Sequence, residues 1–571
     1  MYILGIGDVT HDASVCLMKN NEILVAIELE RLTKIKHNLK LDSGLFSIIE
    51  QGKNIHNVLK KWTVGYRENQ FNSAINYCLE YANASVKDIS ATVVSTLYDD
   101  PIYERKSVLI NHHLAHSAST YYPSNFEKAA ILVMDGCGDF NKDGSSICTL
   151  FAEGDSNAIS ILDTIVGRYD HTQEELKQGA YDSHMVFTNS LGAFYQNVTM
   201  LLGMSYYGEG KTMGLASYGR ANPELNKVRE YVTFLSNGKL EIDNRALFLF
   251  VKDLLDRAHS RLTENELFQY KADIAYAHQK LLEEMVLYLC TYLYKISPSE
   301  NLCLAGGVAL NSAVNYRILQ QTPFKNIFIQ PAAGDAGIAI GAALYGAHAM
   351  NNLPRSNVNT TKLFSPFLGK SYKDTEKCTL QKNRIEQYRV NLAEKDLYTE
   401  IAKQISNKKI IGWFNGRSEI GPRALGARSI LADPRHPQMK DVLNQKIKHR
   451  ESFRPFAPAI LEEEVSRYFK NIHIAPYMSF IADVKENAQN EIPATIHVDN
   501  TARVQTVNAE MNPDFYSLIK AFYRLTGVPV ILNTSFNLAG KPIVETPEDA
   551  VDYFLTMSLD GLYLDGDFYL K

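Results

Sequence analysis

The first 30 residues and the residues after position 129 present the same order of strand and turn patterns. The chain opens with the apolar run YILGIG, the turn DVTHDA, the run SVCLMK and a second turn before ILVAIELE. From residue 129, the run AAILVMDG leads into the turn GCGDFNKDGS, followed by SSICTLFAEG and AISILDTI. Apolar runs bounded by turn residues indicate strands. The repeat predicts two similar halves, each beginning with a strand and hairpin that present polar groups at a strand end.

A repeat of this kind is the signature of a duplicated actin-like, sugar-kinase-like (ASKHA) α/β fold, although many other α/β proteins begin with such a hairpin. In the actin-like fold, nucleotide binds between the two halves. Apolar periodicity predicts helices over residues 189–204 and 264–296. The segments NLCLAGGVALNSAVNYRIL and NIFIQPAAGDAGIAIGAALYGAHAM each predict a strand, a glycine turn and a helix. Such a turn directs backbone N–H groups and the positive end of a helix at an anion.

Composition and segment character divide the chain and exclude several classes of protein. Residues 353–366, rich in Asn, Pro, Ser and Thr, are predicted to link an actin-like domain (1–352) to an α/β C-terminal domain (367–571). The net charge of −5 gives no general attraction to nucleic acid or to an anionic membrane. We find no signal peptide and no membrane-spanning run, and the seven cysteines are scattered without a CxxC pair. We therefore expect a cytoplasmic protein.

The segment NHHLAH, residues 111–116, holds three histidines. On a helix, His112 and His116 lie four residues apart on one face, a spacing that suits two ligands of one divalent ion; a solvated or core-lining face is the alternative. Asp135, after the run ILVM, and Asp335, in PAAGDAG, could complete a mixed nitrogen and oxygen site. Alternatively, Asp135 is a turn acid and Asp335 a helix N-cap. The donor set suits Fe²⁺, which we prefer, or Mn²⁺ or Zn²⁺.

Glycine-rich segments are candidates for nucleotide binding. GEGKTMGLASYG (208–219) and GGVALN (306–311) look like phosphate- and nucleoside-binding loops, because glycine lets a backbone approach phosphate and Lys211 adds positive charge. Neither segment matches a Walker or dinucleotide fingerprint, and a tight strand–helix turn packed on a sheet is the alternative. The candidate nucleotide-binding residues are Gly136, Lys211, Gly214, Gly306, Gly307, Asn311 and Gly334.

The segment from Arg417 to Arg454 carries a net charge of +5 within an acidic chain. A solvated basic face is the usual explanation for such a charge run. Here the arginines alternate with Gly, Ala, Leu and Phe, which favours partial burial around a small anion. Arginine binds phosphate and carboxylate oxygens in a bidentate way. RVQTV, with Arg503, and NTSFN, with Asn533, add hydrogen-bonding groups at apparent strand ends. We expect a phosphorylated small substrate here, since the aromatic residues that would favour nucleic acid are sparse.

In their order along the chain, these motifs resemble those of bacterial O-carbamoyltransferases of the nodulation-factor and antibiotic type. The motifs that carry the resemblance are HDAS, the KIKH region near Lys36, NHHLAH, MDGCGD, GEGKTMGLASYG, GGVALN, PAAGDAG, GPRALGARSILADPR, HRESFRPFAP and NTSFN. The likeness covers essentially the whole chain. It implies an actin-like carbamoyl-transfer domain followed by a YrdC-like domain that forms carbamoyl-adenylate.

The resemblance also implies residue roles in a two-stage reaction. The YrdC-like domain would form carbamoyl-adenylate from carbamoyl phosphate and Mg²⁺-bound ATP. The actin-like domain would transfer the carbamoyl group to a hydroxyl of a small metabolite such as a natural product, toxin, antibiotic or sugar. His11 would be the general base, or alternatively only a turn residue, and the metal ligands would be His112, His116, Asp135 and Asp335. Carbamoyl phosphate and the adenylate would bind to Arg423, Lys448, Arg454, Arg503 and Asn533.

Two other functions remain open. A tRNA threonylcarbamoyl-type modification enzyme would need a basic face, which the net charge does not favour. A non-catalytic, actin-like nucleotide-binding regulator would leave the segment from Arg417 to Arg454 without a purpose. We expect ATP, carbamoyl phosphate and a hydroxylated acceptor as partners of a monomer or homodimer, with no nucleic acid or membrane. Acceptor choice is expected to depend on residues 36–54 and 167–187.

Overall fold

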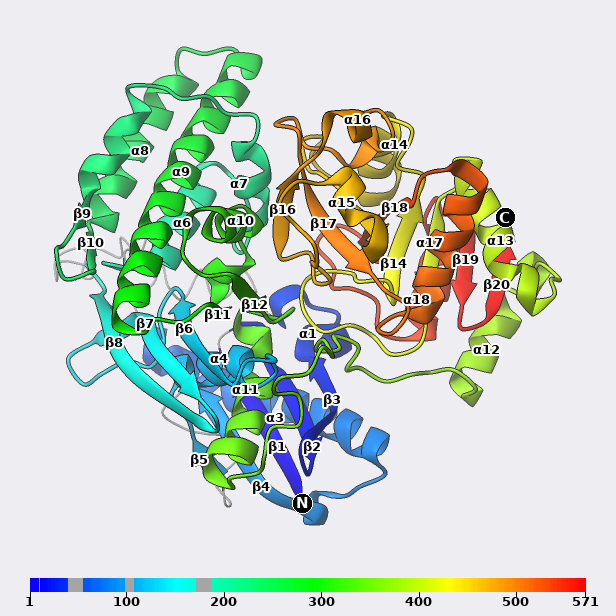
Figure 1. Cartoon of the computed structure of the whole chain (residues 1–571), viewed down its shortest axis with the longest axis horizontal. Helices are drawn as coiled ribbons and strands as arrows, with labels where there is room; N and C mark the ends of the chain where they lie inside the picture. The colour runs from blue at the N-terminus through cyan, green and yellow to red at the C-terminus, as the bar shows by residue number, and fades with distance from the viewer. Residues whose placement is uncertain (10, 39–54, 98–106, 171–186) are drawn as a thin grey trace. The chain divides into compact units, whose positions relative to one another are not determined.

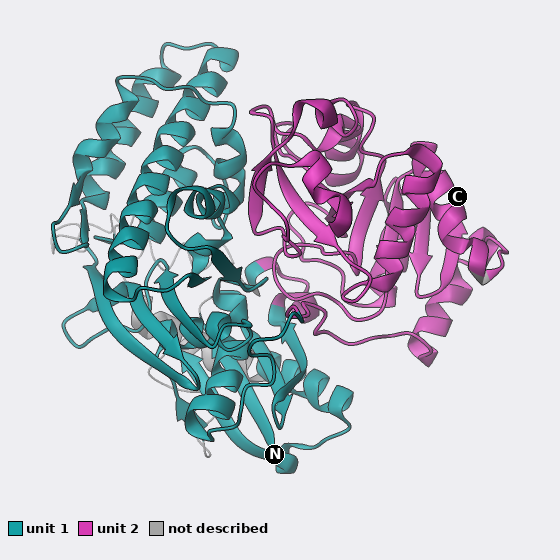
Figure 2. Ribbon diagram, in the orientation of Figure 1, with its two compact units in different colours: residues 1–29, 37–362 teal, residues 30–36, 363–571 magenta. Residues whose placement is uncertain are grey.

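The chain forms two compact units (Figure 2). The computed structural model describes residues 1–9, 11–38, 55–97, 107–170 and 187–571, with backbone only for 38, 55–68 and 394. Unit 1 comprises Met1–Leu29 and His37–Lys362, whereas unit 2 comprises Glu30–Lys36 and Leu363–Lys571. The break between Lys362 and Leu363 falls within the polar segment 353–366. The short segment Glu30–Lys36 belongs to unit 2, although it follows the first hairpin of unit 1.

Unit 1 is built on two five-stranded sheets of the same topology (Figure 1). In each sheet the first three strands form an antiparallel meander. A fourth strand pairs in parallel with the first strand of that meander, and a fifth strand pairs in parallel with the fourth. The first sheet has the order β3-β2-β1-β4-β5, from β1 (Tyr2–Asp8), β2 (Ser14–Lys19), β3 (Glu22–Glu28), β4 (Ile89–Thr96) and β5 (Ser107–Leu109). The second has the order β8-β7-β6-β11-β12, from β6 (Lys128–Met134), β7 (Ser145–Asp155), β8 (Ala158–Arg168), β11 (Asn301–Ala305) and β12 (Asn326–Ile329). The predicted duplication, and with it the actin-like fold, is confirmed.

Two helices pack against these sheets and against each other. α11 (Ile338–Tyr345) lies on β1 and β2, and α4 (His112–Tyr121) lies on β6 and β11. Their contact is close, since a Cβ atom added at Gly341 of α11 would lie 1.9 Å from the carbonyl oxygen of Ala115 in α4. Gly5 of β1 is equally confined, because a Cβ atom there would lie 2.0 Å from the carbonyl oxygen of Ala339. Glycine at these positions lets α4 and α11 approach each other and the first sheet.

The remaining helices of unit 1 include the two long segments predicted from periodicity. α6 starts after Ser190, whose hydroxyl accepts a hydrogen bond from Ala193 N, as expected for an N-cap. The long helix α9 has a Thr263–Glu266 capping box at its start. The elements are α3 (Ile55–Ala82), α6 (Leu191–Leu201), α7 (Glu209–Ala216), β9 (Val232–Phe234), β10 (Leu240–Ile242), α8 (Asn244–His259), α9 (Glu264–Ile296) and α10 (Ser312–Gln321). The short helix α1 (Leu29–Thr33) belongs to unit 2 except for its first residue. No helix of the described residues combines the length and apolar character needed to cross a membrane.

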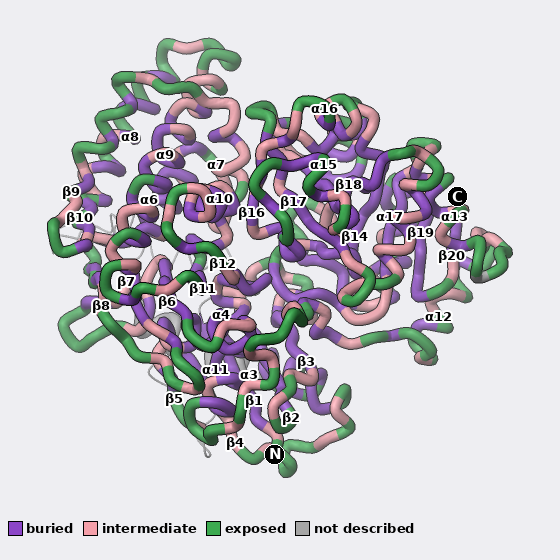
Figure 3. Tube along the Cα trace, viewed as in Figure 1, coloured by how far each residue is buried: buried purple, intermediate pink, exposed green. Residues whose placement is uncertain are grey.

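Unit 2 is an α/β unit around one mixed eight-stranded sheet of order β16-β17-β15-β18-β14-β13-β19-β20. Its strands are β13 (Ile411–Phe414), β14 (Arg428–Ala432), β15 (Ala457–Leu461), β16 (Phe480–Asp483), β17 (Thr501–Val507), β18 (Val530–Ser535), β19 (Gly561–Leu564) and β20 (Asp567–Leu570). Its helices are α12 (Glu376–Arg384), α13 (Leu397–Ser406), α14 (Met439–Val442), α15 (Val465–Tyr468), α16 (Glu486–Gln489), α17 (Pro513–Thr526) and α18 (Pro547–Thr556). The central strands β13, β14, β15 and β19 are buried throughout (Figure 3).

Candidate metal centre and anion site

The first turn of α4 presents two buried imidazoles to the interior of unit 1. Asn111 caps the helix, since its side-chain oxygen accepts a hydrogen bond from Leu114 N at 3.1 Å. Asp139 reinforces the cap by accepting hydrogen bonds from Asn111 Nδ2 at 2.6 Å and from His112 N at 2.7 Å. His112 and His116 are therefore held in register, one helical turn apart.

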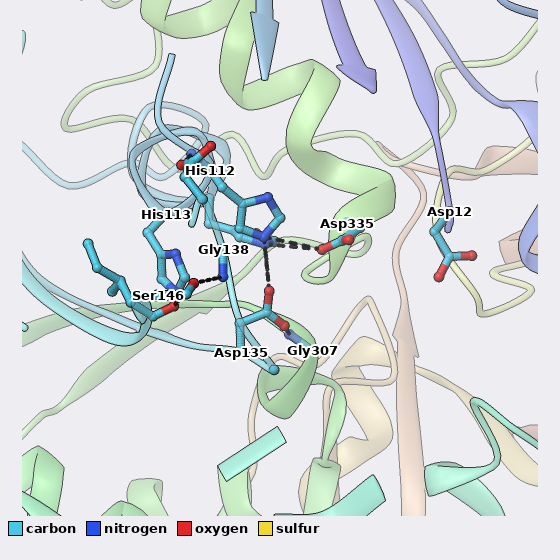
Figure 4. Close-up of polar contacts among 12 residues, drawn as sticks. Asp12, His112, His113, Asp135, Gly138, Ser146, Gly307 and Asp335 are labelled. Carbon is cyan, nitrogen blue, oxygen red and sulfur yellow. Dashed lines mark hydrogen bonds and ion pairs between the residues drawn. The ribbon is translucent and has the colours of Figure 1, made fainter. Parts of the chain in front are cut away.

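Two acids from other elements complete the cluster (Figure 4). Asp135 follows β6, and Asp335 opens the short turn before α11. His112 Nε2 lies 3.0 Å from Asp135 Oδ2 and 3.7 Å from Asp335 Oδ1. His116 Nε2 lies 3.4 Å from Asp135 Oδ2 and 3.3 Å from Asp335 Oδ1. One donor atom from each of the four residues falls within 4.8 Å of the other three, as required for ligands of one ion.

The charges of this cluster fit a divalent cation. Burial lowers the pKa of His116, but hydrogen bonds and charge attraction from Asp135 and Asp335 outweigh burial and raise the pKa to about 9. Burial alone would raise the pKa of Asp135, whereas the hydrogen bonds and charges of the two imidazoles hold it well below its usual value. The carboxylates of Asp135 and Asp335 thus stabilise a positive charge at a buried position. Two imidazole nitrogens and two carboxylates are a donor set that fits iron, manganese or zinc.

The GGVALN turn lies directly beside the cluster. Gly307 N donates a hydrogen bond to Asp135 Oδ1 at 3.0 Å. Gly306 has a φ of 88°, and a Cβ atom there would lie 2.2 Å from the carbonyl oxygen of Met134. The turn therefore orients Asp135, a candidate metal ligand. This geometry supports a packed strand–helix turn over a nucleotide-binding loop as the explanation for Gly306 and Gly307. A Cβ atom at Gly334 would meet no atom closer than 3.6 Å, so that position is open.

Two other nucleotide-binding candidates, Asn311 and Gly136, contact neighbouring parts of the protein. Asn311 accepts a hydrogen bond from Val314 N as the N-cap of α10, and its amide exchanges hydrogen bonds with the buried Gln279. Gly136 packs closely, because a Cβ atom added at Gly192 would lie 2.6 Å from Gly136 N.

The glycine-rich segment 208–219 differs from its prediction. Residues Glu209–Ala216 form the helix α7, so Lys211 and Gly214 lie on a helix and not on a phosphate-binding loop. Gly208 is the N-cap, and most of the segment has backbone angles that any residue can adopt. The glycines had suggested a loop, but the packing of α7 against α9 and α6 stabilises a helix despite them.

His11 lies beside the cluster of candidate metal ligands and interacts with a small group of polar and aromatic side chains. Its Nε2 is 3.5 Å from Asp335 Oδ2, and its Nδ1 is 3.1 Å from Asp12 Oδ2. Asp12 Oδ1 is 2.8 Å from His37 Nδ1. The centroid of the Tyr207 ring lies 4.4 Å from the centroid of the His11 ring and 4.9 Å from that of the His37 ring. Burial lowers the pKa of His11, but the charge of Asp335 and the hydrogen bond and charge of Asp12 raise it to about 9. The Nε2 face of His11 therefore points toward the candidate metal ligands.

The predicted anion-binding residues of unit 2 come from separate elements. Arg423 lies in the turn between β13 and β14, Lys448 ends the helical turn Leu443–Lys448, and Arg454 precedes β15. Arg503 and Asn533 lie within β17 and β18, so the prediction that they stand at strand ends is wrong. They still face the same region, because Asn533 Nδ2 donates to the carbonyl oxygen of Ala424 at 3.1 Å, next to Arg423.

The cations of unit 2 influence one another strongly. Burial, followed by the charge of Arg454, lowers the pKa of Arg423 to about 10. Burial and the charges of Arg423, Arg450 and Arg454 hold the pKa of Arg503 well below its usual value. Burial and neighbouring cations lower the pKa of Lys448 in the same way. Glu451, whose Oε2 lies 3.8 Å from Arg454 Nη1, offsets part of this charge, and a bound anion would offset more of it.

Two family models match most of the chain. Residues 2–344 match the carbamoyltransferase N-terminus, and residues 402–571 match the carbamoyltransferase C-terminus. The chain belongs to the carbamoyltransferase family. It is an enzyme family, and the predicted membership is confirmed.

Two relatives of this carbamoyltransferase match it over nearly its whole length. The chain is 35% identical to the uncharacterised protein sll1178 of Synechocystis sp., over 99% of this chain and 96% of the relative. It is 32% identical to the nodulation protein NolNO of Sinorhizobium fredii, over 98% of this chain and 79% of that protein. Among solved structures, HypF in its phosphate- and nucleotide-bound form matches with a TM-score of 0.39 and 16% identity, over 61% of this chain and 55% of HypF. A likeness this distant supports no functional conclusion.

Three residues near the two sites of this carbamoyltransferase were not among the predicted site residues. His37 and Tyr207 contact the network of His11, and both have positive φ angles, 57° and 59°. Arg450 belongs to the cationic cluster, where burial and the charge of Arg454 lower its pKa to about 9. The net charge of the basic segment signals Arg450. His37 ends the KIKH motif of the family resemblance, but no local pattern marks His37 or Tyr207 as a neighbour of Asp12 and His11, because only the fold brings them together.

Proposed function

We propose that this carbamoyltransferase is an ATP-dependent O-carbamoyltransferase that works through a carbamoyl-adenylate. The observation that carries the proposal is the pairing of two opposite electrostatic sites in one chain. Unit 1 holds a buried cluster of two histidines and two aspartates, and unit 2 holds clustered cations in need of an anion. Carbamoyl activation needs an anion site for phosphates, and carbamoyl transfer needs a site that polarises a carbonyl and removes a proton.

Activation is assigned to unit 2. Carbamoyl phosphate would release its phosphate to water and leave carbamate. An oxygen of carbamate would then attack the α-phosphorus of Mg²⁺-bound ATP, and pyrophosphate would leave. Arg423, Arg454 and Arg503 would hold the phosphate oxygens and stabilise their charge in the transition state, with Lys448 beside them. Asn533 supports this site through its hydrogen bond to Ala424.

Transfer is assigned to unit 1. His112, His116, Asp135 and Asp335 would hold a divalent ion, with Fe²⁺ preferred, which when bound supplies a Lewis acid and offsets the negative charge of Asp335. With the charge of Asp335, which raises the pKa of His11, offset in this way, His11 would be neutral and would accept the proton of the acceptor hydroxyl at Nε2, since its Nδ1 is engaged by Asp12. The hydroxyl oxygen would attack the carbamoyl carbon, and AMP would leave. Gly306, Gly307, Gly334 and Gly136 border this cluster and are proposed to approach the nucleotide, with Lys211 and Gly214 on α7.

The acceptor is proposed to be a hydroxylated small metabolite. Several relatives, NolNO among them, carry the name nodulation protein, and that name concerns those proteins alone. Most of residues 36–54 and 167–187, where we expect acceptor selection, lie outside the described residues. ATP and carbamoyl phosphate are the proposed co-substrates.

Incubation of the purified protein with ATP and carbamoyl phosphate tests the proposal. AMP and pyrophosphate formation that depends on carbamoyl phosphate is expected, whereas ADP would indicate a kinase and no turnover would indicate a regulator. Arg454→Ala should abolish AMP formation. Arg467→Ala, which removes an arginine paired with Glu491 on the surface of the same unit, is the matched control. Mass spectrometry across a panel of hydroxylated metabolites should then find a product heavier by one carbamoyl group.

A further inference from the structure

The segment Glu30–Lys36 leaves the first hairpin of the chain and packs as part of unit 2 (Figure 2). It starts within α1, directly after β3. Residues from the beginning of the chain thus join a unit whose other residues begin more than 300 positions later. This raises the question of which part of unit 2 needs them.

Arg31 provides the central contact of this segment. Its side chain is 1% exposed and is among the largest fully buried side chains of the protein. Arg31 NH2 donates a hydrogen bond to the carbonyl oxygen of Gly421 at 3.0 Å. Gly421 has a φ of 98°, which favours glycine, and lies two residues before Arg423. A buried guanidinium is costly and is retained where its hydrogen bonds hold a particular geometry.

The turn that carries Arg423 is otherwise held from its C-terminal side. The buried carboxylate of Glu419 accepts hydrogen bonds from Leu425 N at 2.6 Å and from Arg428 N at 3.3 Å. Asn533 and Gln505 donate to the carbonyl oxygens of Ala424 and Leu425. Arg31 holds the peptide on the other side of Arg423.

Two lysines of the same segment extend its attachment to unit 2. Lys34 forms an ion pair with Asp549 at the start of α18. Lys36 lies close enough for its positive charge to lower the pKa of Lys448, after the larger effects of burial, Arg450 and Arg454. The segment therefore contacts the turn of Arg423 and adds positive charge near Lys448.

We propose that Arg31 is a positioning residue of the anion site: it fixes Gly421 and thereby the placement of Arg423 toward phosphate oxygens. The N-terminal segment thus completes the phosphate-binding part of unit 2. This inference rests on the proposed function for the identity of the anion, carbamoyl phosphate, although its geometry does not depend on turnover.

Calorimetric binding of carbamoyl phosphate to the full chain tests the inference. Arg31→Met keeps an unbranched apolar side chain in the buried position and removes the guanidinium group that donates to Gly421. It is expected to raise the Kd for carbamoyl phosphate about tenfold, the range expected when a hydrogen bond of a charged group is lost. Arg31→Lys, which keeps a charged donor, should recover part of that affinity. The same order is expected for the KM of carbamoyl phosphate in AMP formation.

Lys34→Ala is the matched control, because it removes the other attachment of the segment without touching Gly421. Its Kd should stay within about twofold of the wild type, since it loses an exposed ion pair. A merely structural role of Arg31 would lower the melting temperature of Arg31→Met and leave its Kd unchanged, and that result would overturn the inference. An equal rise in Kd for Lys34→Ala would also overturn it. If the wild type binds carbamoyl phosphate but forms no AMP, the proposed function fails, while the ratio of Kd values still decides the role of Arg31.

Discussion

At the residue scale, the two candidate sites of the carbamoyltransferase are buried ionisable groups of opposite sign. Asp135 and Asp335 gather positive charge around themselves, and the pKa of His116 rises to about 9 as a result. In unit 2 the pKa of Arg423 falls to about 10, because burial and Arg454 disfavour its charge. The imidazoles and carboxylates of unit 1 therefore stabilise each other's charge, whereas the crowded cations of unit 2 lower the stability of that unit until an anion compensates them.

His116→Ala should remove the metal and leave carbamoyl activation intact. A ligand nitrogen contributes directly to the coordination, so metal affinity should fall by more than the roughly 100-fold that loss of an outer partner can cost. Metal content by mass spectrometry and AMP formation are the two measurements. His113→Ala is the control, since His113 is equally buried on the same turn of α4 but faces Gly138. Equal loss of metal and of AMP formation would contradict the assignment of the two steps to two units.

His278 makes a separate prediction about acid stability. It is buried on α9, and burial lowers its pKa to about 4 from 6.5. Because the unfolded chain binds the proton more readily, stability should be lost as the pH falls from about 6.5 toward 4. His278→Leu should therefore lose about 2 kcal/mol less free energy of unfolding than the wild type between pH 7 and 4.5. Urea unfolding at both pH values measures this, with His259→Leu as the control because that histidine is exposed.

At the element scale, the metal centre depends on the close packing of α4 and α11. α4 carries both histidines, and Asp335 lies in the turn that leads into α11. Their separation is set by Gly341, which admits the backbone of Ala115. A larger residue would move the two sets of ligands apart.

Gly341→Ala should destabilise the protein and weaken metal binding together. The added Cβ atom would lie 1.9 Å from the carbonyl oxygen of Ala115, so the helices must separate, at a cost of roughly 1–3 kcal/mol. Thermal unfolding and metal titration are the measurements. Gly210→Ala is the matched control on α7, because no atom lies within 4 Å of the new methyl group. Alanine has the higher helix propensity, so that variant should be as stable as the wild type or slightly more stable. An unchanged metal affinity in Gly341→Ala would rule out this role of the packing.

At the scale of the whole molecule, the chain consists of two units with their own sheets, each with its own candidate site. The metal candidates lie in unit 1, and the cationic cluster lies in unit 2. On the proposed function, each ligand should stabilise the unit that binds it.

Scanning calorimetry should show this separation. Removing metal with a chelator should lower the unfolding temperature of unit 1, whereas inorganic phosphate should raise that of unit 2. A ligand at 100 times its Kd adds about 2.7 kcal/mol, which corresponds to a shift of a few degrees for units of this size. Chelator treatment of His116→Ala should have no effect on unit 1. A shift of both transitions by either reagent would contradict separate ligand sites.

Local sequence pattern determined the repeated strand and hairpin elements, the two long helices and the i, i+4 spacing of His112 and His116, because each depends on residues close together in the chain. It also identified Asp135, Asp335 and the basic segment as candidates, although their functional roles remain predictions. Local pattern failed for α7, where glycines suggested a loop, and for Arg503 and Asn533, which lie within strands.

Tertiary structure alone decided which distant residues meet. Asp335 lies about 200 positions from Asp135, and only the return of the chain through β11, β12 and α11 brings both carboxylates to His112 and His116. The same holds for Arg31 and Gly421, separated by 390 positions, and for Tyr207 beside His11. Local periodicity reflects backbone geometry, which neighbouring residues specify, whereas contacts between distant residues depend on how sheets and helices pack.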